Sequence, residues 1–117
     1  MIKFENFSFK QNKTQENEIH GADRAIFQKI KSLIDSKSNF NIFTKDNKID
    51  FDKIGIDLVA TFESCQYPSF NNIAYKLENY MDSIEDKQNL VLQEKEKQEI
   101  LQNIYNIILE EFCKIQN

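Results

Sequence analysis

The stretch that decides the fold is residues 93–116, QEKEKQEILQNIYNIILEEFCKIQ. Its apolar residues recur at intervals of three and four, which places them on one face of a helix. They are Ile100, Leu101, Ile104, Ile107, Ile108, Phe112 and Ile115. Apart from Tyr105, Leu109 and Cys113, the remaining positions carry charged and amide side chains, as on a solvated face. This stretch predicts a long amphipathic helix whose apolar stripe must be covered by other elements.

Two further amphipathic helices are predicted before it. Residues 70–86 form one, with Ser69 as its cap, and residues 52–65 form the other, with Asp52 as its cap. Tyr67-Pro68 separates them, since proline interrupts a helix. The stripe of the later helix consists of Phe70, Ile73, Ala74, Leu77, Tyr80, Met81 and Ile84. The stripe of the earlier helix consists of Ile54, Leu58, Val59, Phe62 and Cys65.

The N-terminal part of the chain mixes patterns. A helix is predicted over 19–36, and alternating apolar residues flank the turn-forming Lys45-Asp-Asn-Lys48, which indicates a small hairpin near 40–51. Alternation between Ile2 and Phe9 predicts a short strand. The expected fold is therefore a mainly α single domain, residues 1–117, of about four helices packed as a bundle, with a short N-terminal strand and that hairpin.

Composition excludes several classes of function. The chain has 117 residues, a formal net charge of −4, two Gly and one His. Two glycines are too few for a phosphate-cradling loop, and one histidine excludes a zinc site built on two. Arg24 is the only arginine. Because the planar guanidinium is the preferred reader of phosphate and guanine, no direct nucleic-acid binding is expected.

The histidine, the two cysteines and the carboxylates do not form a recognisable catalytic group, and we expect no enzyme activity, cofactor or metal site. Residues 44–54 resemble the second half of an EF-hand loop, but the first and twelfth ligand positions would fall on Ile42 and Lys53, which cannot bind calcium. His20 is expected to face solvent near a helix start. Cys65 and Cys113 are expected to be free thiols in or beside the core.

The expected location is the cytoplasm. No apolar run approaches the roughly 18 residues of a membrane helix, and residues 1–10 lack the apolar stretch of a signal peptide. A chain rich in Lys, Asn and Ile and poor in Arg also indicates an AT-rich genome, bacterial or phage.

Negative charge is unevenly distributed. Residues 1–40 hold seven basic and five acidic residues, residues 41–81 hold four and six, and residues 82–117 hold four and eight. The densest acidic group in the middle of the chain, with nearby aromatic residues as interface anchors, gives the predicted partner-binding set. That set is Asp46, Asp50, Asp52, Asp57, Glu63, Tyr67 and Phe70.

These properties predict a small acidic interaction protein that binds and neutralises a basic protein partner. Bacterial immunity proteins against nuclease toxins are similar in size, acidity and lack of motifs, and so are some phage-encoded inhibitors of host defence nucleases. No residue motif assigns the chain to one such family. The alternative is a helical assembly protein without catalytic activity, which forms a homodimer through the C-terminal helix, where Tyr105, Leu109 and Cys113 flank the main stripe.

Overall fold

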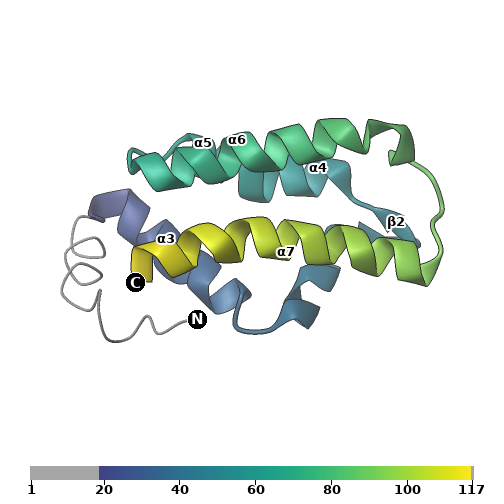
Figure 1. The fold of residues 1–117 in the computed structure, drawn as a ribbon, viewed down its shortest axis with the longest axis horizontal. Helices are drawn as coiled ribbons and strands as arrows, with labels where there is room; N and C mark the ends of the chain where they lie inside the picture. The colour runs from purple at the N-terminus through teal and green to yellow at the C-terminus, as the bar shows by residue number, and fades with distance from the viewer. Residues whose placement is uncertain (1–18, 117) are drawn as a thin grey trace.

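A computed structural model of the chain describes residues 19–116 (Figure 1). The predicted N-terminal strand lies outside the described residues. The main helices and strands are α3 (Gly21–Leu33), β1 (Thr44–Lys45), β2 (Lys48–Ile49), α4 (Phe51–Ile54), α5 (Ala60–Glu63), α6 (Pro68–Ser83) and α7 (Glu94–Gln116). Two 3₁₀ helices are η1 (Lys37–Phe43) and η3 (Glu85–Lys87), and η2 (Gly55–Val59) is a π-helical turn.

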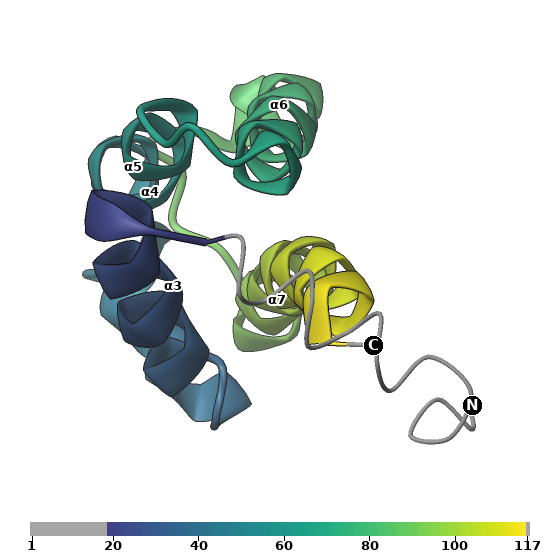
Figure 2. The ribbon, with the colours of Figure 1, turned by 90° about the vertical axis from the view of Figure 1, so that its left-hand side faces the viewer.

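The predicted mainly α architecture is confirmed. Seen from one end, α3, the helix made by α4 and α5, α6 and α7 surround a single core (Figure 2). The two long helices α6 and α7 run side by side in opposite directions, joined by the connection that contains η3 (Figure 1). The core is rich in aromatic residues. Its fully buried phenylalanines are Phe27, Phe40, Phe43, Phe62, Phe70 and Phe112.

The last two helices follow the sequence pattern closely. In α7, every residue of the predicted stripe except Ile107, which is partly buried, is buried. In α6, Phe70, Ile73, Ala74 and Leu77 are buried. The predicted start of α6 is wrong by two residues, because Pro68 is the first helical residue and Tyr67 precedes it. Proline suits that position, since the first turn of a helix does not use its N–H.

The preceding helix contains an unexpected π-helical turn. α4, η2 and α5 form one continuous helix, and η2 is the π-helical part. The buried residues Ile54, Leu58 and Phe62 are spaced by four throughout. In a regular α-helix such a spacing drifts around the axis, and the wider π turn reduces that drift.

The cap of this helix is Asp50. Its carboxylate accepts a hydrogen bond from the backbone N–H of Lys53 at 3.0 Å, so the prediction of Asp52 as the cap is wrong by two residues. Asp52 instead lies in the first turn, where a negative charge interacts favourably with the helix dipole.

We expect Asp50→Ala to lower the free energy of unfolding by about 1 kcal/mol, because it removes the acceptor for an otherwise unpaired N–H. Asp52→Ala removes only an exposed charge and should cost less than about 0.5 kcal/mol. Urea unfolding of the two variants compares them directly. An equal loss in both would contradict the assignment of Asp50 as the cap.

The segment before the hairpin differs most from its prediction. α3 ends at Leu33 rather than at residue 36, and its most buried residue is Phe27. Residues 37–43 form the 3₁₀ helix η1, with Phe40 and Phe43 buried and Ile42 exposed. A spacing of three is the repeat of a 3₁₀ helix, and the apparent alternation of Phe40 with Ile42 was misleading.

The hairpin is confirmed but is shorter than predicted. Thr44 pairs with Ile49 and Lys45 with Lys48, around a two-residue turn. Both turn residues, Asp46 and Asn47, have positive φ (55° and 64°), as a type I′ turn requires.

The hairpin turn is fastened to the start of α7. The Asn47 carbonyl accepts the N–H of Leu92 at 3.0 Å, and the Asn47 side-chain oxygen accepts from Lys97 Nζ at 3.0 Å. Lys97 also pairs with Glu94 at 3.0 Å, although its own side chain is almost completely buried. These contacts hold the turn in place despite the shortness of both strands.

Candidate functional site

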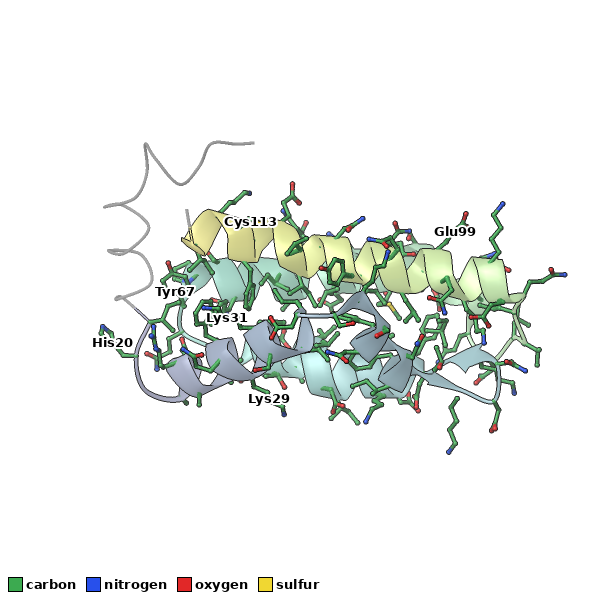
Figure 3. All side chains as sticks on the ribbon, turned by 90° about the horizontal axis from the view of Figure 1, so that it is seen from below. His20, Lys29, Lys31, Tyr67, Glu99 and Cys113 are labelled. Carbon is green, nitrogen blue, oxygen red and sulfur yellow. The ribbon has the colours of Figure 1, made fainter. Side chains whose placement is uncertain are left out.

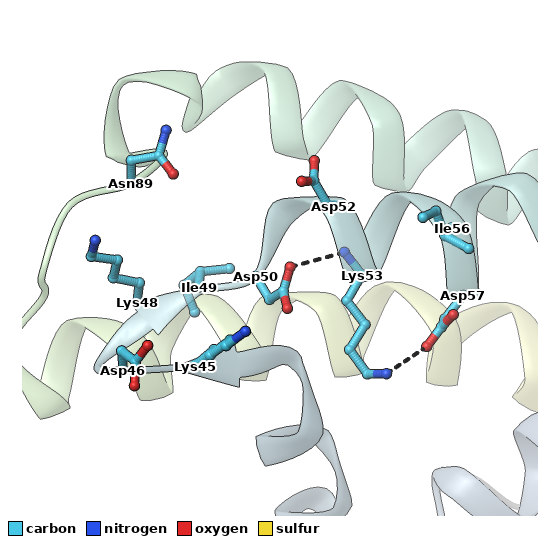
Figure 4. A pocket seen from close by; sticks show the side chains of 10 residues that line it. All are labelled: Lys45, Asp46, Lys48, Ile49, Asp50, Asp52, Lys53, Ile56, Asp57 and Asn89. Carbon is cyan, nitrogen blue, oxygen red and sulfur yellow. Dashed lines mark hydrogen bonds and ion pairs between the residues drawn. The ribbon is translucent and has the colours of Figure 1, made fainter.

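An open hollow of about 550 Å³ lies between the hairpin, the first turns of the α4–α5 helix and Asn89 (Figure 4). Four of the five predicted carboxylates, from different turns of the chain, border it. The hairpin supplies Asp46, and the following helix supplies the others. The lining residues are Lys45, Asp46, Lys48, Ile49, Asp50, Asp52, Lys53, Ile56, Asp57 and Asn89.

Each of these carboxylates is placed by local structure. Asp46 occupies the first position of the type I′ turn, where Asp is well tolerated. Asp50 caps the helix, so one of its oxygens is turned toward the backbone. Asp57 forms an ion pair with Lys53 at 3.1 Å, with both side chains 41% exposed (Figure 4). Asp52 is exposed in the first turn.

Lysines moderate the charge of the hollow. Four aspartates and three lysines line it, so its formal charge is −1. Lys53 is engaged by Asp57, whereas Lys45 and Lys48 face each other across the hairpin. The hollow is therefore a surface of mixed charge with a small negative excess, and not a uniform acidic patch. Such a surface can bind and orient a basic ligand.

The remaining predicted partner residues lie elsewhere. Glu63 is exposed at the far end of the same helix. Tyr67 is partly buried at the end of the molecule where α3 begins, near His20 (Figure 3). Phe70 is fully buried and its ring stacks on Phe112, with centroids 5.9 Å apart. Because Phe70 has no exposed surface, it cannot anchor a partner in this structure.

Backbone irregularities concentrate around the hollow. Within residues 19–116, the non-glycine residues with positive φ are Asp46, Asn47 and Asn89, and all belong to it or border it. The π-helical turn η2 delivers Ile56 and Asp57 to its wall. Such irregularities are frequent at functional sites. Sequence reasoning missed Asn89 and Ile56, because nothing in the local pattern links them to the hairpin.

A smaller apolar groove of about 280 Å³ adjoins the hollow. Asp57 lines both, so the two share a wall. Buried Ile30, Phe43 and Leu58 and partly buried Leu33 form the apolar part of the lining, and Ile42, 52% exposed, lies at its edge. The polar part of the lining is Lys29, Ser32 and Asp57. Lys29 extends from α3 into solvent (Figure 3).

The opposite end of the molecule has a buried carboxylate with a structural role. Asp23 on α3 is 8% exposed and accepts the backbone N–H groups of Gln66 and Tyr67, each at 2.8 Å. It thereby fastens α3 to the start of α6. The nearby Cys65 thiol donates to the Thr61 carbonyl at 3.3 Å.

The environment of Cys65 opposes thiolate chemistry. Burial, followed by the negative charge of Asp23 and a hydrogen bond with it, raises the pKa of the Cys65 thiol to about 12. A nucleophilic cysteine needs a lowered pKa instead. Cys65 and Cys113 are both free, as predicted, and His20 is exposed, also as predicted.

In the part of the chain that the structure describes, no group of three His, Cys, Asp or Glu residues is arranged to hold a metal ion. Among the described helices, none is long and apolar enough to cross a membrane. No protein-family model, curated protein or solved structure matches the chain. The hollow and its neighbouring groove are therefore the features of the chain that bear on its function.

Proposed function

We propose that this chain is a non-catalytic interaction protein that binds and neutralises a basic protein partner, such as a bacterial toxin nuclease. The observation that carries the proposal is the gathering of Asp46, Asp50, Asp52 and Asp57 around one open hollow. These residues come from a turn and from two turns of a helix, and the fold places them on one surface.

The fixed backbone around the hollow supports a binding role. Asp50 is held by its capping hydrogen bond, and the hairpin turn is held by Leu92 and Lys97. Groups that are already fixed lose little conformational freedom when a partner binds, which favours affinity. A basic catalytic surface of a nuclease binds phosphates through Lys and Arg, and the carboxylates of the hollow can take the place of those phosphates.

Electrostatics should then show in the kinetics of association. The net charge of the chain is −4, and exposed carboxylates accelerate encounter with a basic partner in a salt-dependent way. The lysines of the hollow contribute selectivity, because a partner must place its basic groups beside the aspartates and away from Lys45 and Lys48.

The test begins with isolation of the partner from the native organism and measurement of its binding and inhibition by the purified protein. We expect Asp52→Lys to weaken the affinity about tenfold at low salt, with most of the loss in the association rate. The loss should shrink as the salt concentration rises, because screening reduces the contribution of exposed charges. Surface plasmon resonance at several salt concentrations measures both rates.

Glu99→Lys is the matched control. Glu99 is exposed on α7 and lines a different surface, together with Lys95, Gln98, Gln102 and Asn103 (Figure 3). The same change of charge there should leave the affinity within about twofold of the original protein. If both reversals weakened binding equally, net charge rather than the hollow would be responsible, and the proposed site would be wrong.

Self-association through α7, the alternative assembly role, has less support. Within Glu94–Ile115 every exposed side chain is polar. Tyr105 packs against Phe40 with ring centroids 5.5 Å apart, so it is engaged within the domain, and Leu109 and Cys113 are half-buried. An obligate dimer interface is usually more apolar than this surface.

A further inference from the structure

The groove beside the hollow provides an apolar contact surface, which the predicted partner-binding set lacks. Interfaces usually depend on a few well-packed apolar anchors, and the two aromatic residues predicted for that role are partly or fully buried at the other end of the molecule. An anchor residue projects from the surface, whereas the groove is concave. Its buried lining of Ile30, Phe43 and Leu58 is a concave apolar surface that can accept a side chain rather than supply one.

We infer that this groove accepts an apolar side chain of the partner, from a segment whose neighbouring Lys or Arg residues reach the hollow. The inference rests on the proposed function and specifies the partner's chemistry. Asp57 is the residue that links the two halves, because it lines both the groove and the hollow. An occupant of the groove therefore places its flanking residues beside carboxylates, which favours basic residues by charge complementarity.

The ion pair between Asp57 and Lys53 does not prevent a basic residue of the partner from binding Asp57. Asp57 and Lys53 are 3.1 Å apart, but both side chains are 41% exposed, and an exposed pair of this kind contributes little to stability. An incoming arginine can bind the carboxylate in a bidentate manner, which the flexible lysine cannot do. Lys53 can then move into solvent without leaving a buried charge unpaired.

Ile42 at the edge of the groove supports the same assignment. It is 52% exposed although it lies between the buried residues Phe40 and Phe43 in η1. The 3₁₀ turn buries every third residue and leaves Ile42 outside. Covering its exposed surface together with a partner's side chain removes apolar area from water on both molecules.

Synthetic peptides test the inference with the whole protein. The probe is a peptide whose centre reads Lys-Arg-Leu-Lys-Arg. One matched peptide has Gly in place of Leu, and another keeps Leu but has Gln in place of every Lys and Arg. Amide chemical shifts in ¹H–¹⁵N NMR spectra report which residues each peptide touches and how tightly it binds.

We expect the first peptide to shift amides of both the groove and the hollow. The Gly peptide should bind about tenfold more weakly and shift only the hollow, since the apolar anchor is gone. The Gln peptide should bind weakly at both, because the attraction to the carboxylates is lost. Ile42→Gln should reduce the advantage of Leu over Gly, whereas Tyr75→Gln, at a similarly exposed residue on α6, should not.

The outcomes separate the two proposals. Equal binding of the Leu and Gly peptides, with shifts confined to the hollow, would overturn the groove as an anchor site and leave the proposed function standing. Strong binding of the Gln peptide in the groove would overturn the basic nature of the occupant. If no peptide shifted amides of the groove or the hollow at concentrations up to millimolar, both the groove inference and the proposed site would be overturned.

Discussion

Replacing Phe70 with alanine is expected to lower the free energy of unfolding by about 3–5 kcal/mol, the cost typical of truncating a fully buried phenylalanine. Its ring contacts three other phenylalanines and Tyr67, and none of its surface is exposed. The substitution opens a cavity where α3, α5, α6 and α7 meet. Because domains of this size are stable by only about 5–15 kcal/mol, the loss is a large fraction of the total.

Urea unfolding followed by circular dichroism measures this effect. Tyr75→Ala is the control on the same helix, since Tyr75 is 63% exposed and its truncation should change stability by less than about 0.5 kcal/mol. Binding of the partner should be unchanged in Phe70→Ala wherever the variant is folded. Weaker binding by a fully folded Phe70→Ala protein would restore Phe70 as an interface residue.

Removing the carboxylate of Glu111 is the second large effect. Glu111 lies on α7 with only 4% of its side chain exposed, and it accepts hydrogen bonds from Asn72 at 3.1 Å and Lys76 at 2.9 Å on α6, and from Lys114 at 3.3 Å. We expect Glu111→Ala to cost about 1.5–3 kcal/mol, because it removes charge-assisted hydrogen bonds that join α7 to α6. Glu110→Ala is the matched control. The Glu110 side chain is 64% exposed and 3.7 Å from Lys76, so its loss should cost less than about 0.5 kcal/mol.

The same carboxylate makes stability depend on pH. Burial alone would raise the pKa of Glu111, but hydrogen bonds and charges from Lys76 and Lys114 outweigh it, and the pKa is lowered in the folded protein. A lowered pKa means that the carboxylate stabilises the fold above its unfolded-state pKa, and that this contribution is lost as the pH falls through the folded-state value.

Unfolding measured from about pH 7 to about pH 3 should therefore show a decline in stability below about pH 5. In Glu111→Gln the decline should be smaller, because the amide oxygen still accepts from Asn72 but does not titrate. Parallel curves for the two proteins would show that other carboxylates cause the acid dependence.

The sequence pattern predicted the fold where helical periodicity was long and uninterrupted. α6 and α7 extend over several turns, so many apolar residues agree on which face of each helix is buried. Prediction was wrong where short segments offer two readings. In residues 37–43, Phe40 and Ile42 suggest a strand, whereas Phe40 and Phe43 suggest a 3₁₀ turn, and only packing against α7 and α3 selects the latter.

The candidate site was predictable only as a list of charges. Asp46, Asp50, Asp52 and Asp57 are close in sequence, so a short hairpin followed by a helix brings them together. The lysines between them reach the same surface in the same way. How far they offset its negative charge depends on side-chain positions, which sequence spacing does not define. The apolar groove depends on contacts between α3, η1 and η2, and no local pattern contains such information.

The π-helical turn also bears on how this chain could vary in length. Ile54, Leu58 and Phe62 follow one another at intervals of four, whereas a chain lacking one residue between the first two would have intervals of three and four. That is the ordinary repeat of an amphipathic α-helix. Gly55 is thus equivalent to a single-residue insertion, and a shorter relative could keep the same core while lacking the bulge that carries Ile56 and Asp57 outward. A gap at this point in an alignment would therefore mark a change of surface rather than a change of fold.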